Sequence, residues 1–188
     1  MRLILIRHGE SEYNLRLSRS LDSSLSKFGE QQVLQTAINI NHMKGPTQFA
    51  GHTSPYRRTL ETAAIIQSQT GIPFKVMLGP REVMTIYDYC KIGNHSKDFP
   101  QFDWSNFTTD PEIEFQHEKD EEYLDRVEGY IQNELEEPGT IVVSHGMTVV
   151  TMMELAMGIR RVPSSYFYVD NASITHVVDG RLVCYNQR

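Results

Sequence analysis

Apolar residues gather along this chain in short runs, separated by longer amphipathic stretches. Residues 2–6 (RLILI) and 140–144 (TIVVS) are continuous apolar runs rich in β-branched side chains, a pattern typical of strands buried on both faces. Residues 49–52 and 74–78 are weaker segments of the same kind. The pattern therefore predicts four strands with room for helices between them.

A first helix is predicted after Ser26, whose hydroxyl can cap its first turn. The apolar residues Val33, Leu34, Ala37 and Ile38 follow with helical spacing and would share one face. We expect that face to pack against the strands.

A second helix is predicted where Ser54 offers a cap and Pro55 suits the first helical position. It should run to about Gln69, because Gly71 and Pro73 then interrupt the helical pattern. This helix would follow directly on the short strand at residues 49–52.

The C-terminal half continues in the same manner. Helical patterns cover residues 118–136 and 147–157, and strand patterns cover residues 173–178 and 181–185. The dipeptide Asp179-Gly180 favours a tight turn between the last two strands.

Strands that alternate with helices predict an α/β fold, here a three-layer α/β/α sandwich with a mostly parallel central sheet. A chain of 188 residues fits a single domain spanning residues 1–188. In such sheets ligands bind beyond the carboxyl ends of the strands. Three polar segments follow strand ends in this chain, at His8, at residues 54–58 and at His145. We therefore expect them to meet at one edge of the sheet.

Composition narrows the class of protein. A hydrophobic share of 39% and an aromatic share of 10% are typical of a globular protein, and no apolar run reaches membrane-spanning length. The N-terminal run is too short for a signal peptide, so we expect a cytoplasmic protein. The net charge of −6 disfavours nucleic acid as a partner, although a local arginine cluster can still attract a small anion. The two distant cysteines, Cys90 and Cys184, predict neither a disulfide framework nor a metal site.

Two histidines carry the functional argument. His8 follows a strand between Arg7 and Gly9, and His145 follows another strand just before Gly146. A lone histidine in such a place is usually structural, but two strand–His–Gly junctions in one sheet favour a shared site. Neutral imidazole is a competent nucleophile toward phosphorus. Backbone N–H groups at the start of the helix after His145 would also favour an anion.

Arginines are available to hold that anion. Arg57 and Arg58 are adjacent on the predicted second helix, where neighbouring positions point about 100° apart. One of them can therefore face the site while the other faces solvent. The planar guanidinium group suits a phosphate.

With these motifs the chain resembles the histidine phosphatase superfamily, in its phosphoglycerate mutase-like branch. Residues 7–14 (RHGESEYN) are similar to the family's RHGE[ST]xxN signature, and residues 25–32 (LSKFGEQQ) to its LTxxGxxQ segment. Residues 54–63 (SPYRRTLETA) are similar to its SxxxRTxxTA helix, which identifies Arg58 as the inward arginine. Residues 144–146 (SHG) and 171–173 (NAS) resemble its second histidine motif and its late N-x-S turn.

The resemblance implies a role for each matching position. His8 would be the nucleophile that becomes phosphohistidine, and His145 would be a second catalytic residue beside it. The phosphoryl group would be bound by the remaining motif residues, Arg7, Asn14, Arg58 and Gly146. Because the arginines would stabilise the charge of the transition state, the resemblance implies no metal ion and no other cofactor.

The leaving group needs a proton, which the family takes from a carboxylic acid soon after the third strand. Glu82 matches that placement and is the candidate general acid. The residues behind it, 84–89 (MTIYDY), lack the Gly-Trp-Glu pattern that is common in the family. Asp88 therefore stays open as an alternative acid.

Residues 83–117 would form a lid or insert, as in relatives. This segment is rich in aromatic residues, namely Tyr87, Tyr89, Phe99, Phe102, Trp104, Phe107 and Phe115. Their rings would either pack on the domain or line the site, where they would favour an apolar or aromatic leaving group. Lys91 and Lys97 would instead favour a second anionic group, and the sequence leaves these alternatives open.

Three functions are compatible with these residues. The first is a metal-independent phosphatase acting on a small phosphorylated metabolite, and the second is a phosphoglycerate mutase-type phosphotransferase or a sugar-bisphosphatase. The third is a phospho-ligand-binding module without turnover. The chain is short for the mutases of this family, and the complete set of site residues disfavours the third function. We therefore expect a phosphatase, with its oligomeric state open between monomer and homodimer and with no nucleic acid or membrane as partner.

Overall fold

The computed structural model describes residues 1–83, 90–107, 112–115, 117–136, 138–161 and 167–188, without the side chains of residues 90–91 and 112–115. Within these ranges the chain forms a six-stranded sheet with the order β3-β2-β6-β1-β7-β8. Its strands are β1 (Arg2–Arg7), β2 (Ala50–Thr53), β3 (Phe74–Val76), β6 (Gly139–Ser144), β7 (Ile174–Val178) and β8 (Arg181–Gln187). The pairs among β3, β2, β6 and β1 are parallel, and β7 and β8 are added by antiparallel pairs.

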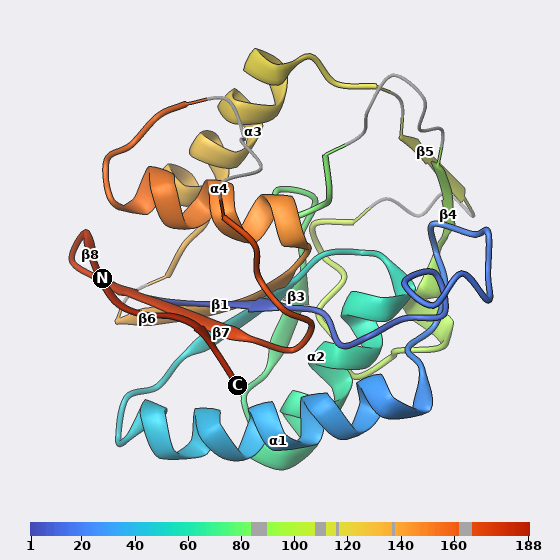
Figure 1. Cartoon of the computed structure of the whole chain (residues 1–188), viewed down its shortest axis with the longest axis horizontal. Coiled ribbons are helices and arrows are strands. Elements are labelled where there is room, and N and C mark those ends of the chain that lie inside the picture. Colours follow the sequence, from blue (N-terminus) through green and yellow to red (C-terminus); the bar gives the residue numbers. More distant parts are fainter. Residues whose placement is uncertain (84–89, 108–111, 116, 137, 162–166) are drawn as a thin grey trace.

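Helices cover both faces of this sheet (Figure 1). The helices α1 (Lys27–Lys44) and α2 (Arg57–Thr70) lie on one face, and α3 (Asp120–Asn133) and α4 (Gly146–Ala156) lie on the other. A small antiparallel sheet of β4 (Cys90–Gly93) and β5 (Glu112–Phe115) and the 3₁₀ helix η1 (His95–Lys97) complete the described elements. The predicted α/β/α sandwich with a mostly parallel sheet is confirmed. Among the helices described here, none combines the length and apolarity needed to cross a bilayer.

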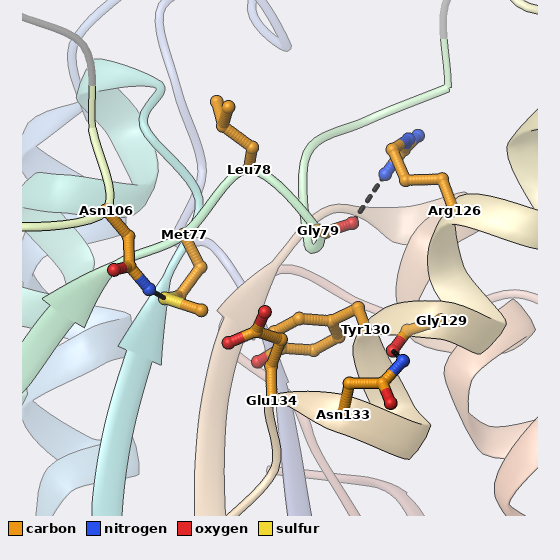
Figure 2. A pocket seen from close by; sticks show the side chains of 9 residues that line it. All are labelled: Met77, Leu78, Gly79, Asn106, Arg126, Gly129, Tyr130, Asn133 and Glu134. Carbon is orange, nitrogen blue, oxygen red and sulfur yellow. Dashed lines mark hydrogen bonds between the residues drawn. The ribbon is translucent and has the colours of Figure 1, made fainter.

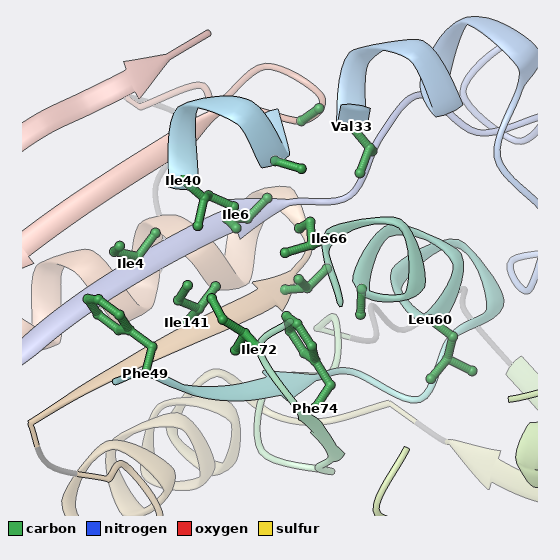
Figure 3. Packing of buried hydrophobic residues seen from close by; sticks show 14 of the residues in the cluster. Ile4, Ile6, Val33, Ile40, Phe49, Leu60, Ile66, Ile72, Phe74 and Ile141 are labelled. Carbon is green, nitrogen blue, oxygen red and sulfur yellow. The ribbon is translucent and has the colours of Figure 1, made fainter. Parts of the chain in front are cut away.

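Successive residues of β1 serve two different cores, as expected of a strand buried on both faces. Ile4 and Ile6 belong to the core under α1 and α2, whereas Leu3 and Leu5 belong to the core under α3 and α4. Figure 3 shows the first core, whose labelled side chains come mainly from the sheet, α1 and α2. Because both faces of β1 are covered, its carboxyl end is held firmly in the sheet.

The prediction for α1 is correct at its start and partly wrong along its apolar face. Ser26 caps the helix by accepting a hydrogen bond from an amide of the first turn. Leu34 and Ile38, however, are 44% and 47% exposed. The buried stripe passes instead through Thr36, a polar residue that can be buried because its hydroxyl donates to the carbonyl oxygen of Ala172.

The predicted start of α2 is also wrong. The N-cap is Tyr56 rather than Ser54. The amide of Ser54 still bonds to β6, and its hydroxyl lies 2.8 Å from Nε2 of His145, so it does not cap the helix. The cap comes from a distant loop, where the carboxylate of Asp22 accepts a hydrogen bond from the Arg57 amide over 2.7 Å.

Several boundaries differ from the prediction. The third strand ends at Val76 rather than at residue 78, and β4 lies within residues 83–117, where no strand was predicted. Its partner β5 lies some twenty positions further along the chain, so no local sequence pattern indicates that the two strands pair. The turn at Asp179 and Gly180 is confirmed, with φ values of 48° and 74°.

Part of the aromatic segment packs on the domain. Phe99 and Phe102 are buried in the core, and Trp104 and Phe107 are partly buried against it. Asp103 forms a parallel bridge with Lys75 of β3, which extends the edge of the main sheet. These four rings therefore pack on the domain. The remaining side chains named in the sequence prediction lie outside the described ones, at Tyr87, Tyr89, Lys91 and Phe115.

Candidate active site

The register of the sheet brings the two predicted histidines together. Arg7 of β1 pairs with Ser144 of β6, so the next residues, His8 and His145, leave the same edge of the sheet side by side. The amide of His8 donates to the carbonyl oxygen of Ser144 over 2.9 Å. The two imidazole rings lie with their centroids 5.4 Å apart. They therefore share one site.

His8 is held in a single tautomer. Its Nδ1 lies 2.7 Å from the carbonyl oxygen of Gly9, and because that oxygen can only accept, Nδ1 carries the proton. Burial, and then the charges of Arg58 and Arg7, lower the pKa of His8 well below its usual value. The ring is therefore neutral at pH 7, with an unprotonated Nε2.

Arg58 lies between the two histidines. Its Nε donates to Nε2 of His8 over 3.1 Å, and one of its terminal nitrogens donates to Nδ1 of His145 over 2.9 Å. The side chain is almost fully buried. Its neighbour Arg57 turns away and contacts the carboxylate of Glu61 at 3.1 Å. Of the two adjacent arginines, Arg58 is thus the one in the site.

His145 is neutral as well. Because Arg58 can only donate, Nδ1 of His145 accepts, and Nε2 carries the proton toward the hydroxyl of Ser54. Burial, followed by the charges of Arg58 and His8, lowers the pKa of His145 well below its usual value. Ser54, which the sequence suggested as a helix cap, instead orients this ring from behind.

Arg7 and Gly146 form the wall next to His8. A terminal nitrogen of Arg7 donates to the carbonyl oxygen of Val169 over 2.6 Å. The Nε of Arg7 is buried and has no hydrogen-bond partner among the described residues. A Cβ at Gly146 would lie 3.5 Å from this Nε, so the guanidinium group rests against the start of α4. A buried N–H beside a helix N-terminus is suited to an anion.

Asn14 is oriented by a second asparagine. Its Oδ1 accepts from the amide of Ser11 over 3.1 Å and from Nδ2 of Asn171 over 3.3 Å. The same Nδ2 of Asn171 donates to the carbonyl oxygen of His8 over 3.1 Å. Because the oxygen end of Asn14 is occupied, its amide nitrogen is the end that it can offer to a ligand. The late N-x-S turn thus braces the site.

Glu82 is a buried carboxyl group. One of its oxygens accepts from the amide of Val83 over 3.0 Å and from the hydroxyl of Thr148 over 3.1 Å. Burial is the dominant influence and raises the pKa of Glu82, against the smaller lowering by these hydrogen bonds and by Arg58. A raised pKa favours the protonated form that a general acid requires. The alternative acid, Asp88, lies outside the described residues.

The loop that carries Glu82 is supported from α3 and β6. Arg126 of α3 donates to the carbonyl oxygen of Gly79, as Figure 2 shows, and to that of Arg81 over 3.4 Å. Glu118 holds the same guanidinium group through two contacts of 2.7 Å. The hydroxyl of Ser144 donates to the carbonyl oxygen of Pro80, also over 2.7 Å. Nothing in the local sequence pattern singled out Arg126.

The predicted residues open into one cavity of about 500 Å³. It is lined by six of the seven residues that the sequence indicated, namely Arg7, His8, Asn14, Arg58, Glu82 and Gly146. The seventh, His145, is fully buried behind them. The rest of the lining is apolar or aromatic and was not predicted, namely Tyr13, Leu21, Val83, Met147, Phe167, Tyr168 and Val169. Within the described part of the chain, no cluster of three or more His, Cys, Asp or Glu side chains forms a metal site.

Two neutral histidines and two arginines at the strand ends of an α/β sandwich define a class of phosphoryl-binding proteins. A model of the histidine phosphatase superfamily (branch 1) matches residues 3–181, and the chain belongs to this family. A glucosyl-3-phosphoglycerate phosphatase from Mycolicibacterium vanbaalenii is 32% identical over 83 residues, which is 43% of this chain and 36% of that relative. The match thus spans about a third of the length of the curated relative.

Solved structures share the fold over nearly the whole chain. A phosphoserine phosphatase from Entamoeba histolytica, solved with 3-phosphoglyceric acid, has a TM-score of 0.67 at 24% identity, covering 100% of this chain and 97% of its own. The ecdysone phosphate phosphatase from Bombix mori, solved with tungstate, has a TM-score of 0.72 at 16% identity, covering 100% and 93%. At these identities the likeness shows the fold, which is phosphoglycerate mutase-like.

Proposed function

We propose that this protein is a phosphatase that hydrolyses small phosphomonoesters through a phosphohistidine on His8, without a metal ion. One observation carries the proposal, which is the contact of the Arg58 guanidinium with both His8 and His145. A buried cation between two neutral imidazoles is a site that an anion would fill. The family and the name of the curated relative agree with a phosphorylated substrate.

In the first step Nε2 of His8 attacks phosphorus and the bond to the leaving oxygen breaks. The proton on Nδ1, held by the carbonyl oxygen of Gly9, leaves the lone pair of Nε2 for the new bond. Glu82 gives its proton to the leaving oxygen, so the products are an alcohol and phosphohistidine. The raised pKa of Glu82 supports this role.

The arginines stabilise the charge on the phosphoryl oxygens during this step. The Nε of Arg7 has no partner among the described residues and can donate to the anion without losing a hydrogen bond. The N–H groups of Arg58 exchange their imidazole acceptors for phosphoryl oxygens, which also frees Nε2 of His8. The amide nitrogen of Asn14 adds a further donor.

In the second step water attacks the phosphohistidine. Glu82 is now a carboxylate and takes a proton from the attacking water, while the bond between phosphorus and Nε2 breaks. Inorganic phosphate leaves, and both His8 and Glu82 return to their starting protonation states. One carboxyl group therefore serves both steps as acid and then as base.

We extend the proposal to the surroundings of the site. Residues 83–117 would act as its cover, which is supported by Ile92 of β4, a buried residue that packs with Tyr56 and Leu21. Leu21 itself lines the cavity. The substrate would be a small phosphorylated metabolite, met in the cytoplasm.

Hydrolysis of p-nitrophenyl phosphate in EDTA tests the function. We expect turnover by the wild-type protein, its loss in His8→Ala, and an acid-labile phosphoenzyme after rapid quenching of the wild type alone. His42→Ala is the matched control, because His42 is an exposed histidine of α1 far from the cavity in sequence. Activity that EDTA abolishes, or that His8→Ala retains, would contradict the proposal, as would binding of vanadate without any turnover.

A further inference from the structure

The outer wall of the catalytic cavity is aromatic. Tyr13, Phe167 and Tyr168 line it at side-chain exposures of 42%, 40% and 67%. Large rings are usually more buried than this, and exposed aromatic surface around a cavity marks a binding site. Met147 and Val83 continue the same wall toward Glu82. The part of the cavity away from the histidines is therefore built for apolar contact.

Tyr168 places this wall next to the phosphoryl site. Its ring lies 5.6 Å from the guanidinium carbon of Arg7, in a cation–π arrangement. A group attached to a phosphate that Arg7 holds would thus lie near this ring. The segment is anchored on β8, because the hydroxyl of Tyr185 donates to the carbonyl oxygen of Tyr168 over 2.7 Å and the Phe167 ring packs against Tyr185.

Beyond Arg7 and Arg58, the described lining of this cavity holds no cation for a second anionic group. Among its described lining residues, the only positive charges are Arg7 and Arg58, which belong to the phosphoryl site. Of the residues whose side chains are not described, only Lys91 is basic. Lys97, which the sequence suggested for a second anion, does not line the cavity, and Arg16 and Arg19 lie in an adjoining one.

We propose that the leaving group of the substrate is an alcohol bearing a flat apolar ring, held against Tyr13, Phe167 and Tyr168. This inference rests on the proposed phosphatase function and specifies its substrate class. Stacking of a substrate ring on these side chains removes apolar surface of both partners from water. A small acidic leaving group, such as the glycerate of 3-phosphoglycerate, would not gain this contact.

Esters of primary alcohols test the preference, because they differ little in leaving-group chemistry. We expect kcat/KM for 2-phenylethyl phosphate to exceed that for propyl phosphate and 3-phosphoglycerate by about tenfold or more. Equal values for the three esters, or a preference for 3-phosphoglycerate, would overturn the inference while leaving the phosphatase in place. Failure to hydrolyse any of them, together with p-nitrophenyl phosphate, would instead remove the proposed function.

Variants of Tyr168 locate the preference. Tyr168→Ala should lower the ratio of kcat/KM for 2-phenylethyl phosphate to that for propyl phosphate about tenfold, whereas Tyr168→Phe should keep this ratio. Phe28→Ala is the control, because Phe28 is a 57% exposed aromatic residue of α1 outside this cavity. An equal loss for both esters in Tyr168→Ala would show that the ring serves Arg7 rather than the leaving group, and would overturn the inference.

Discussion

The Nε of Arg58 donates a hydrogen bond to Nε2 of His8 over 3.1 Å. The atom proposed to attack phosphorus is therefore also the atom that a buried cation contacts. This arrangement disfavours protonation of the ring and orients it before any substrate arrives. It also means that binding of a phosphoryl group has to replace the contact, so the same N–H serves the resting and the reacting state.

Arg58→Lys should lower kcat/KM for p-nitrophenyl phosphate by about 10² or more. A lysine presents one compact ammonium group and cannot contact both imidazoles as the guanidinium does. Arg57→Lys on the same helical turn is the control and should change the value less than twofold, because Arg57 faces Glu61 and Asp98. Steady-state kinetics of the two variants decide the matter, and similar losses would count against a special role for Arg58.

Glu82→Gln should slow 2-phenylethyl phosphate by about 10² and p-nitrophenyl phosphate far less, because the nitrophenolate leaves without a proton. For the alkyl ester, wild-type activity should fall as pH rises through the raised pKa of Glu82, which then loses its acid form. The variant should lack this dependence. Equal slowing of the two esters would move the acid role elsewhere, with Asp88 the next residue to test.

Arg126 is expected to act through the loop that carries Glu82 rather than on the substrate. Arg126→Gln removes donors to the carbonyl oxygens of Gly79 and Arg81 and should shift the ratio of alkyl to nitrophenyl ester activity in the same direction as Glu82→Gln, by about tenfold. Arg126→Lys should restore part of the ratio. Arg160→Gln is the matched control, since Arg160 pairs with the exposed face of α3 through Glu121, Asp125 and Glu128. A loss of stability with an unchanged ratio would make Arg126 merely structural.

The two site histidines should make the fold less stable in mild acid. Each has a folded pKa well below the ordinary value of 6.5, so the unfolded chain binds protons that the native state does not. The free energy of unfolding should therefore fall by about 1 kcal/mol per histidine as pH drops from 6.5 to 5.5. Urea unfolding at several pH values would show this slope, and over the same pH range the double variant His8→Asn/His145→Asn should lose about 2 kcal/mol less than the wild type. An unchanged slope in the double variant would contradict the assignment of neutral rings.

Much of the fold could be predicted because the main strands are continuous apolar runs. The end of each run also predicted where His8 and His145 leave the sheet, and the motif residues around them line one cavity. What the pattern missed depends on partners far along the chain. The exposure of Leu34 and Ile38 follows from the buried hydroxyl of Thr36, which needs a carbonyl group in another segment.

The start of α2 and the contacts that support the Glu82 loop could not be predicted from the sequence for the same reason. Asp22 caps the helix from a loop 35 positions away, and no local motif connects the two. Arg126 reaches the acid-bearing loop from α3 across a similar separation. The rings of Phe167 and Tyr168 carry no periodic signal, so only the folded chain places them beside Arg7.

The register that pairs Arg7 with Ser144 determines both how the apolar side chains of β1 and β6 pack and how close the two imidazoles lie. A slip of one position along this ladder would turn every apolar side chain of β1 toward the wrong layer, at a cost that the whole fold resists. The positions of His8 and His145 therefore do not depend on the residues of the outer cavity wall. Substitutions in the aromatic wall can therefore change which alcohols are accepted, while the strand register keeps the two histidines in place.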